Sequence, residues 1–541
     1  MSSQEATAKD KTKEEILKES QKRRTFAIIS HPDAGKTTLT EKLLLYGGAI
    51  HEAGSIKQRK AARHAASDWM SIEQDRGISV TSSVMKFELD DIRYNLLDTP
   101  GHKDFSEDTF RTLIAADCAL MVIDVAKGVE EQTEKLFEVC KLRQTPVVTF
   151  VNKCDRPGMD PLEVMSNVEN KLGIKAVPAN WPLGYGNEFR GVYDFRSKEL
   201  HLYTKEAHGA KKAEAEVYDL EAGLEACGLN ERDIENFREE VLILEDELEA
   251  LKEEGFDKGE ITPVFFGSAL NNYGLDLFLR YFSGLAPAPQ QYTNNEGNSV
   301  DVNEPFSGFV FKMQANMNPD HRDCTAFVRV ASGKFERGMK VVLNDTGKSV
   351  KTATPHSLMG DERSLVEEAY PGDIIALFNP GDFRIGSTIR DNKLKIDYDV
   401  IPLFSPEHFR KASSKDPMKR KQLREGLQQL SEEGVVYVFE MPGGVGNELL
   451  LGTVGALQFD VVVHRMKSEY NVEMNLTGTT YMAARWLGNN DQDAFDKLGG
   501  MFSTQVTRDI DGNPLVVFES KYALDQATEK IGEDRLLKFK T

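Results

Sequence analysis

The sequence has no long hydrophobic run, since none of its apolar stretches reaches the roughly 18 residues that a membrane-spanning helix needs. Its polar N-terminal residues, up to Arg24, contain no apolar core of a secretory signal. Cysteines are few, and the five of them lack the paired spacing of a disulfide framework or a zinc site. We therefore expect a cytoplasmic protein with no membrane contact, whose thiols are reduced and mostly buried.

Positive charges are fewer than negative ones. The sequence has 67 Lys and Arg and 87 Asp and Glu, which gives a net charge of -20. Spread evenly, this charge would repel nucleic acid. It is uneven: residues 213–254 hold 16 acidic and 3 basic residues, whereas residues 410–424 hold 7 basic and 1 acidic. The basic segment is a candidate contact for RNA and the acidic one for a protein partner, and the alternative for both is a plain solvated surface.

A chain of 541 residues exceeds what one hydrophobic core usually supports, so we expect three or four domains. Residues 23–290 alternate apolar runs of strand length with helical patterns, which predicts a doubly wound α/β domain with a mostly parallel sheet. Two runs separated by Asp90 and Asp91 predict an antiparallel hairpin at its edge. The acidic stretch interrupts this alternation, which indicates an insert at about 160–260.

The remaining sequence divides into three parts. Residues 1–22 are a polar N-terminal extension. Residues 300–395 contain short strand-like runs rich in Val, Phe and Gly, which predict a β-barrel domain. Residues 396–541 begin with a basic helical pattern through Leu423, Leu427 and Leu430 and continue with further strands and helices. The expected fold class is therefore multidomain α/β: a P-loop type doubly wound domain, a β-barrel domain and a C-terminal α/β domain.

A phosphate-binding loop is predicted at the end of the first apolar run. The run is followed by Ser30, His31, Pro32, Asp33, Ala34, Gly35, Lys36, Thr37 and Thr38, and then by a helical pattern. In a P-loop, backbone N–H groups at a helix N-terminus hold phosphates, Lys36 neutralises their charge, and the Thr37 hydroxyl coordinates Mg²⁺. Ser30 stands where the general pattern has Gly, but it is small enough for the loop. The alternative is a chance Gly-Lys-Thr before a helix.

A second motif follows another apolar run and consists of Asp98, Thr99, Pro100, Gly101 and His102. A carboxylate at this place can hold the metal, mostly through water, and the Gly101 N–H can reach a γ-phosphate. His102 stands where it can orient an attacking water. The alternative is an ordinary turn with an exposed histidine.

A third motif selects the base and consists of Asn152, Lys153, Cys154 and Asp155. A carboxylate that accepts two hydrogen bonds matches the N1–H and amino group of guanine, whereas adenine has no such pair of donors. Further on, the tripeptide Ser268, Ala269 and Leu270 can direct backbone N–H groups toward guanine O6. We therefore predict GTP and GDP, not ATP, bound at the carboxyl ends of the strands.

A switch segment is predicted just before the hairpin, at Arg76, Gly77, Ile78 and Ser79. The Ser79 hydroxyl would supply a further Mg²⁺ ligand while the segment closes over the γ-phosphate, and loss of that phosphate would release it. The alternative is a plain loop before a strand.

Together these motifs resemble those of translational GTPases, the class of elongation factor G. Four other segments closely resemble the bacterial peptide chain release factor 3 family: RHAASDWM from Arg63, RGISVTSSVM from Arg76, WPLGYG from Trp181 and GALQFDVVVHR from Gly455. The resemblance runs from about residue 20 to the C-terminus. Elongation factor G shares the site motifs but carries two further domains after the third, whereas only about 140 residues follow Val400 here.

The resemblance implies a GTPase of translation termination that is stimulated by the ribosome and removes class-1 release factors after peptide release. It implies the ribosome, through its RNA and proteins, and class-1 release factors as partners, with no DNA, and we expect a monomer. Lys36 and His102 are the expected catalytic residues, with Pro32 and Ile78 shielding the site. The rivals are a translocase-like GTPase, a nucleotide-gated binding protein with incidental hydrolysis, and a P-loop kinase, against which Asp155 and Ser79 argue.

Overall fold

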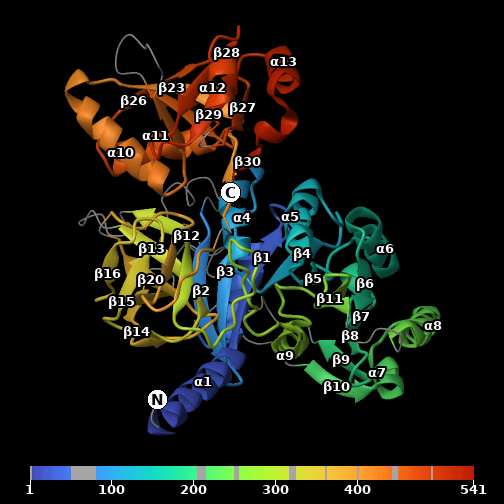
Figure 1. The fold of residues 1–541 in the computed structure, drawn as a ribbon. Helices are drawn as coiled ribbons and strands as arrows, with labels where there is room; N and C mark the ends of the chain where they lie inside the picture. The colour runs from blue at the N-terminus through green and yellow to red at the C-terminus, as the bar shows by residue number, and fades with distance from the viewer. Residues whose placement is uncertain are drawn as a thin grey trace.

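The computed structural model of the protein contains three bodies in sequence along the chain (Figure 1). It describes residues 3–49, 81–203, 215–248, 255–315, 324–359, 362–379, 381–398, 401–440, 449–488 and 491–540. The predicted switch segment with Ser79 lies outside these ranges. Within them, no helix is both long and apolar enough to cross a membrane.

The first body is built on a seven-stranded sheet with the order β2-β3-β1-β4-β5-β11-β6. The strands are β1 (Arg23–Ser30), β2 (Ser83–Leu89), β3 (Ile92–Asp98), β4 (Cys118–Asp124), β5 (Val147–Asn152), β6 (Lys175–Pro178) and β11 (Ile261–Phe266). All neighbours are parallel except β2 and β3, which form the predicted hairpin. Asp90 and Asp91 at its turn both have positive φ, as the tight turns of two-residue hairpins require.

Helices cover both faces of this sheet. They are α2 (Lys36–Tyr46) and α9 (Leu275–Leu285) on one face, and α4 (Ser106–Ile114), α5 (Glu131–Leu142) and α6 (Pro161–Leu172) on the other. Strand β4 shows why, because all of its residues are buried and alternate ones face opposite cores. Leu120 packs in the core with α2, whereas Met121 packs in the core with α5. A strand buried on both faces is typical of a doubly wound fold, and the predicted fold class is confirmed.

A separate four-stranded antiparallel sheet, β10-β9-β8-β7, carries the acidic sequence. Its elements are β7 (Asn180–Leu183), β8 (Gly191–Asp194), β9 (Glu199–Tyr203), β10 (Ala215–Asp219), α7 (Leu220–Ala226) and α8 (Glu231–Leu248). The insert is expected from about 160, but α6 packs on the main sheet and β6 pairs with β11. The segment that leaves the main sheet therefore starts near Asn180, because the acidic composition marks only its later part.

Some acidic residues of α8 hold this small sheet in place, so they do not all form a solvated surface. The Trp181 indole N–H donates to Glu240 over 2.8 Å, and the Tyr193 hydroxyl donates to Glu245 over 2.9 Å. Burial raises the pKa of Glu240. The helix buries Leu244 and leaves Leu242 exposed.

The second body is an antiparallel sheet of eight strands, in the order β16-β15-β21-β12-β13-β20-β17-β18, accompanied by the small pair β14 and β19. The strands are β12 (Ser307–Ala315), β13 (Cys324–Ser332), β14 (Phe335–Glu336), β15 (Lys340–Leu343), β16 (Ser349–Lys351), β17 (His356–Met359), β18 (Glu362–Leu365), β19 (Glu368–Ala369), β20 (Ile374–Phe378) and β21 (Thr388–Arg390). Val310, Val328, Ile375 and Ile389 meet in its core.

The third body contains two antiparallel sheets, β24-β25-β23-β26 and β27-β29-β28. Its strands are β23 (His408–Ser414), β24 (Tyr437–Glu440), β25 (Leu449–Thr453), β26 (Met474–Gly478), β27 (Ala483–Trp486), β28 (Thr504–Arg508) and β29 (Pro514–Phe518). Its helices are α10 (Arg420–Glu432), α11 (Gln458–Ser468), α12 (Gln492–Leu498) and α13 (Lys521–Ile531). Strands β22 (Leu403–Phe404) and β30 (Phe539–Lys540) pair at its base.

The basic run of residues 410–424 is not one helix. It starts in β23, turns at Asp416, and enters α10 only after the 3-10 turn at Pro417. The Asp416 carboxylate accepts from the Met418 N–H, so it caps the new turn, and Pro417 suits the first position after the cap.

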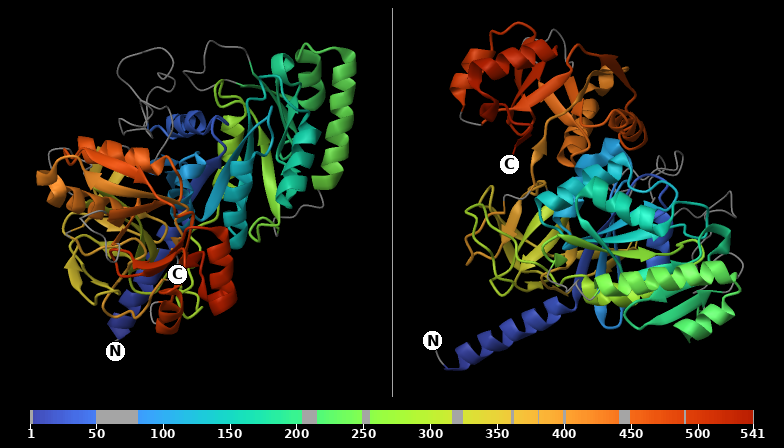
Figure 2. Two further views of the ribbon diagram at one scale, coloured as in Figure 1. Left: turned by 90° about the horizontal axis from the view of Figure 1, so that it is seen from above. Right: turned by 90° about the vertical axis from the view of Figure 1, so that its right-hand side faces the viewer.

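Helix α1 (Ser3–Gln21) precedes β1 and extends away from the three bodies (Figures 1 and 2). The contacts described for it lie toward its C-terminal end. There the Tyr370 hydroxyl donates to Glu15 over 2.6 Å, and Glu19 forms an ion pair with Arg23 over 2.9 Å. The predicted polar extension is thus helical at its described residues and is tied to the second body.

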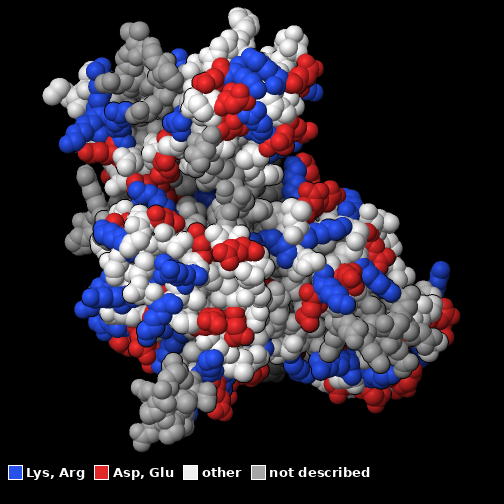
Figure 3. All heavy atoms as spheres, in the orientation of Figure 1, with Lys and Arg blue, Asp and Glu red and all other residues white. Residues whose placement is uncertain are grey.

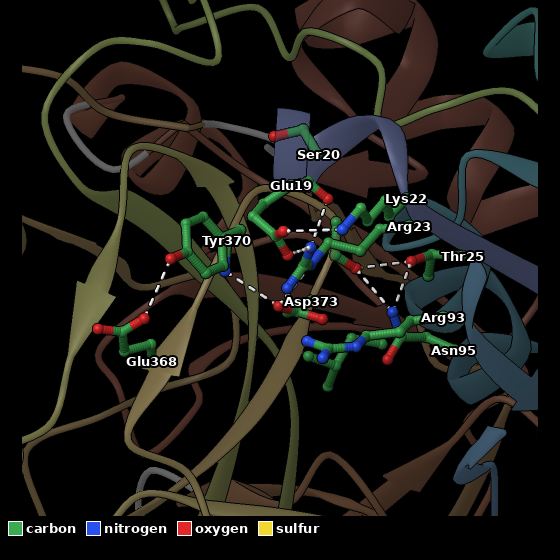
Figure 4. A network of polar contacts seen from close by, with 12 residues as sticks. Glu19, Ser20, Lys22, Arg23, Thr25, Arg93, Asn95, Glu368, Tyr370 and Asp373 are labelled. Atoms are coloured by element: carbon green, nitrogen blue, oxygen red, sulfur yellow. Dashed lines mark hydrogen bonds and ion pairs between the residues drawn. The ribbon is translucent and has the colours of Figure 1, made fainter. Parts of the chain in front are cut away.

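A buried polar network joins the first two bodies (Figure 4). Arg23 lies in β1 and forms an ion pair with Asp373 of the second body over 2.8 Å. The carbonyl of Gly372 accepts from the Thr25 hydroxyl at 2.6 Å and from the Asn95 amide at 3.0 Å. Since both donors lie on inner strands, the second body is fixed directly against the sheet that carries the predicted site.

Candidate functional site

The four sequence motifs meet at one edge of the main sheet. They follow the carboxyl ends of β1, β3, β5 and β11, which are parallel. Parallel strands present all their carboxyl ends on the same side, where open α/β sheets bind ligands. The structure therefore brings together all the predicted site residues that it describes; Ser79 is the exception because it lies outside the described ranges.

The loop from Ser30 to Gly35 has the backbone shape that phosphate binding needs. Ser30 is the buried last residue of β1, and Asp33 and Gly35 have φ angles of 67° and 102°. A side chain at Gly35 would overlap the amide of Asn152, so only glycine fits. Helix α2 starts directly afterwards, and Gly35 has no side chain with which to cap its first N–H groups. These N–H groups and the helix dipole suit an anion.

The charged centre of the site is an ion pair between Lys36 and Asp98. Lys36 Nζ lies 2.5 Å from Asp98 Oδ1, and the two side chains are only 7% and 2% exposed. Each of these buried charges can instead pair with a ligand of opposite charge. The lysine can pair with a phosphate, and the carboxylate can pair with a cation. The Thr99 hydroxyl donates to the Ile28 carbonyl over 2.6 Å and ties this motif to β1.

The residues present fit Mg²⁺ bound together with a nucleotide. Among the described residues no group of three or more His, Cys, Asp or Glu could hold a metal by itself. Mg²⁺ in nucleotide sites needs no such cage, because it takes one or two protein oxygens and completes its shell with phosphates and water. Asp98 and the partly exposed Thr37, next to Lys36 in α2, offer oxygens of this kind.

His102 is held by the turn that follows it. Its Nδ1 accepts from the backbone N–H of Asp104 at 3.2 Å and lies 3.6 Å from the Asp104 carboxylate. Because Nδ1 accepts, the proton of the neutral ring is assigned to Nε2. Gly101 faces the first loop, since the nearest atoms to a side chain there would be Pro32 and the Ser30 carbonyl, at 3.7 and 3.8 Å.

The predicted base motif forms hydrogen bonds with the backbone of the predicted phosphate loop. The Asn152 amide donates to the Ala34 carbonyl over 2.9 Å. Lys153 Nζ donates to the Asp33 carbonyl over 2.5 Å and pairs with Asp124 over 2.7 Å. Two motifs that are distant in sequence, 118 positions apart at Ala34 and Asn152, are therefore joined by direct hydrogen bonds.

The predicted base-binding residues lie at the end of β5, in the loop after it and in the loop after β11. The Asp155 carboxylate accepts from the Asn271 amide over 2.8 Å, which fixes its direction. The Ala269 N–H already donates to Asn152 Oδ1 over 2.8 Å. The Ser268 N–H donates to the Tyr273 carbonyl over 3.0 Å, so a contact with guanine O6 would have to come from the Leu270 N–H. Burial raises the pKa of the Cys154 thiol to about 12, so this residue contributes packing and no charge.

Sequence reasoning missed Asp124 and Asn271. Asp124 ends the apolar strand β4, just as Asp98 and Asn152 end theirs, so the same pattern could have revealed it. Asn271 carries no such signal, because its role depends on a loop that brings it to Asp155.

Comparison with known proteins agrees with this geometry. Residues 21–288 match the family model of the elongation factor Tu GTP binding domain, and residues 305–392 match elongation factor G domain 2. Residues 398–528 match the model of the class II release factor RF3, C-terminal domain. A crystal structure from Thermus thermophilus aligns with a TM-score of 0.68 at 24% identity, covering 84% of this chain and 67% of its own, and supports the fold alone.

Curated relatives match along nearly the whole chain. A peptide chain release factor 3 of Gloeothece citriformis is 50% identical over 517 residues, which cover 94% of each chain. One of Microcystis aeruginosa is 48% identical over 527 residues, covering 96% of this chain and 94% of its own.

The P-loop, the base motif and the domain that contains them define a translational GTPase. The match of the third body and the identity along the chain narrow this class. The chain belongs to the peptide chain release factor 3 family.

Proposed function

We propose that this protein acts on the ribosome in translation termination and uses GTP hydrolysis in the removal of class-1 release factors after peptide release. The observation that carries this proposal is the C-terminal match over residues 398–528, because elongation factors share the nucleotide site. The ribosome and class-1 release factors are its proposed partners, and it works in the cytoplasm as a monomer. The proposed domains are residues 23–290, 300–395 and 396–541, preceded by an extension.

In the proposed reaction, Lys36 and the N–H groups at the start of α2 hold the phosphates and stabilise the charge that develops during phosphoryl transfer. Bound Mg²⁺ would neutralise further phosphate charge, with Thr37, Ser79 and, through water, Asp98 as its ligands. Nucleotide binding separates Lys36 from Asp98, since each then gains its own partner.

His102 is proposed to orient the attacking water. Its Nδ1 accepts from the Asp104 N–H, so the Nε2–H of the neutral ring can donate to that water. Pro32, which lies beside Gly101, is the proposed shield of this place. Asp155 is the proposed selector of guanine, oriented by Asn271.

The ribosomal RNA contact is proposed for the basic segment of β23 and α10. Lys and Arg side chains gather at the end of the third body where α10 lies (Figure 3). Arg420 and Lys421 are exposed, and among the described residues Lys421 forms a long ion pair with Glu425, at 3.7 Å. Changing both cations to Glu is expected to weaken ribosome binding and to reduce its dependence on salt, because fewer counterions are released.

GTP turnover with and without ribosomes carrying a class-1 release factor tests the proposal. We expect strong stimulation by these ribosomes, and His102→Ala is expected to remove both the hydrolysis and multiple-turnover release of the factor. If factor removal continued unchanged without hydrolysis, the protein would be a nucleotide-gated binder. If ribosomes were translocated and the factor stayed bound, the translocase-like alternative would hold.

A further inference from the structure

Helix α11 of the C-terminal domain is capped by a residue of the GTPase domain. The helix begins at Gln458, and its N-cap position is Leu457, which has no side-chain oxygen to accept from the first N–H groups. The Leu457 N–H donates instead to Asp104 Oδ2 over 2.6 Å. Asp104 is 8% exposed. A carboxylate at this end of a helix is favoured both as an acceptor and by the helix dipole.

The approach of the two domains at this cap leaves no space for a side chain. A Cβ at Gly455 would overlap the backbone of Asp104 and would lie 2.5 Å from its carbonyl oxygen. The Gly455 N–H is satisfied by Gln458 Oε1 at 2.8 Å. The backbone around Gly455 is therefore shaped to receive Asp104.

The helix that follows Asp104, α4, makes further contacts with the C-terminal domain. Glu107 of α4 pairs with Arg111 in the same helix and accepts from the Tyr437 hydroxyl of the C-terminal domain over 2.7 Å. One turn away, the rings of Phe110 and Phe404 pack with their centroids 5.0 Å apart. The C-terminal domain thus rests on the segment directly behind His102.

Asp104 connects this interface to His102 through its two functional groups. Its carboxylate caps α11, while its backbone N–H donates to His102 Nδ1. Both contacts depend on the short 3-10 turn that contains Asp104, so movement of α11 changes the constraint on the histidine ring.

We propose that Asp104 is a positioning residue that couples docking of the C-terminal domain to the orientation of His102. While Asp104 caps α11, the turn holds the ring through Nδ1 and restrains hydrolysis. Loss of the cap releases the turn and allows the ring to align with the attacking water. This inference rests on the proposed role of His102.

Gly455→Ala tests the coupling and leaves every residue of the nucleotide site unchanged. The added methyl group must push Asp104 away, and a lost cap changes a docking equilibrium by about twofold to thirtyfold. We expect ribosome-independent GTP turnover to rise by a factor in this range, with GTP affinity unchanged. The matched control is Gly478→Ala in the same domain, whose Cβ would meet no described atom within 4 Å and which should leave turnover within twofold.

Variants of Asp104 test the same link from the other side. Asp104→Ala removes the cap and should raise turnover as Gly455→Ala does, and combining the two should add little further effect because they break one contact. Asp104→Asn keeps an acceptor oxygen and should restore most of the restraint. A purely structural disturbance at Asp104 would not be reversed by the isosteric amide, so recovery in Asp104→Asn separates the coupling from general damage.

Hydrogen exchange at the start of α11 shows whether the cap has been lost. Turnover that falls, or that stays within twofold of wild type in both Gly455→Ala and Asp104→Ala, overturns the coupling. Unchanged exchange of the Leu457 amide in Asp104→Ala also overturns it, since the cap would then not exist. Should Gly455→Ala fail to fold, the pair of Asp104 variants decides. Wild-type protein that ribosomes do not stimulate would instead refute the proposed function itself.

Discussion

Arg329→Met would remove the cation from the most completely buried of the described ion pairs between the GTPase domain and the second body. Arg329 Nη2 lies 2.8 and 2.7 Å from the two carboxylate oxygens of Asp117, and the side chains are 0% and 1% exposed. The same guanidinium donates to the Gly372 carbonyl over 2.6 Å. Methionine has a similar length but carries no charge or hydrogen-bond donor.

The expected cost is large because the substitution leaves a charged carboxylate in the interior. Breaking one partner of a buried pair costs about 3–5 kcal/mol. The Gly372 carbonyl adds little to this loss, since it keeps the Thr25 and Asn95 donors. The matched control is Arg238→Met, which breaks exposed pairs with Glu221 and Glu235, whose side chains are 64% and 62% exposed. Solvent screens such exposed pairs, so their loss should change stability little.

Native-state hydrogen exchange of β4 and β13 measures the lost free energy of unfolding locally. Strand β4 begins next to Asp117, and β13 contains Arg329. This local measurement suits a protein of several domains, where a single unfolding free energy is not well defined. A loss of about 3–5 kcal/mol accelerates exchange by about 100-fold to 4,000-fold. Replacing Asp117 by Leu in the same variant should recover much of the stability, because no buried charge then remains unpaired. Acceleration below about tenfold by Arg329→Met would refute the reasoning.

Three substitutions at the nucleotide site and one chemical modification elsewhere have defined outcomes. Asp155→Asn should weaken GTP binding by about 10-fold to 150-fold, the value of a charge-assisted hydrogen bond, and raise affinity for xanthosine triphosphate; unchanged guanine preference in a titration would contradict the assigned base pocket. Lys36→Ala should sharply weaken triphosphate binding. Gly35→Ala should also weaken it, because the added methyl group displaces Asn152. Undiminished affinity of either variant in equilibrium binding would count against the P-loop. Alkylation of the native protein at pH 8 should modify the partly exposed Cys324 first, because burial raises the thiol pKa of Cys140 and Cys154 to about 12 and leaves little thiolate; mass spectrometry showing equal labelling would be inconsistent with this burial.

Much of the site could be predicted because its residues follow directly from strand ends. Asp98, Asn152 and Ser268 each come after an apolar run, and a parallel sheet has to gather such positions at one edge. The hairpin at Asp90 and Asp91 is equally local, since the turn residues and the alternation on either side define it. The reduced state of the thiols also follows from spacing and composition, and the structure confirms that four of the five cysteines are buried and that all are free.

Other features depend on contacts that the sequence pattern does not encode. The predicted beginning of the insert is too early because acidic composition says nothing about β6 pairing with β11. The predicted basic helix through Leu423, Leu427 and Leu430 is confirmed as α10. The basic residues before it lie in β23, which the sequence pattern did not reveal because a strand that pairs with β25 and β26 is stabilised by distant partners.

The sequence by itself predicted a guanine nucleotide, the edge of the sheet at which the motifs gather and the family, because these rest on short motifs and on strand order. The tertiary structure alone decided how the domains meet. Asp117 reaches Arg329 across 212 positions, and Asp104 reaches Leu457 across 353. Such pairs have no periodicity or spacing to reveal them, since they form only when separately folded surfaces pack and each buried charge or helix end finds a partner.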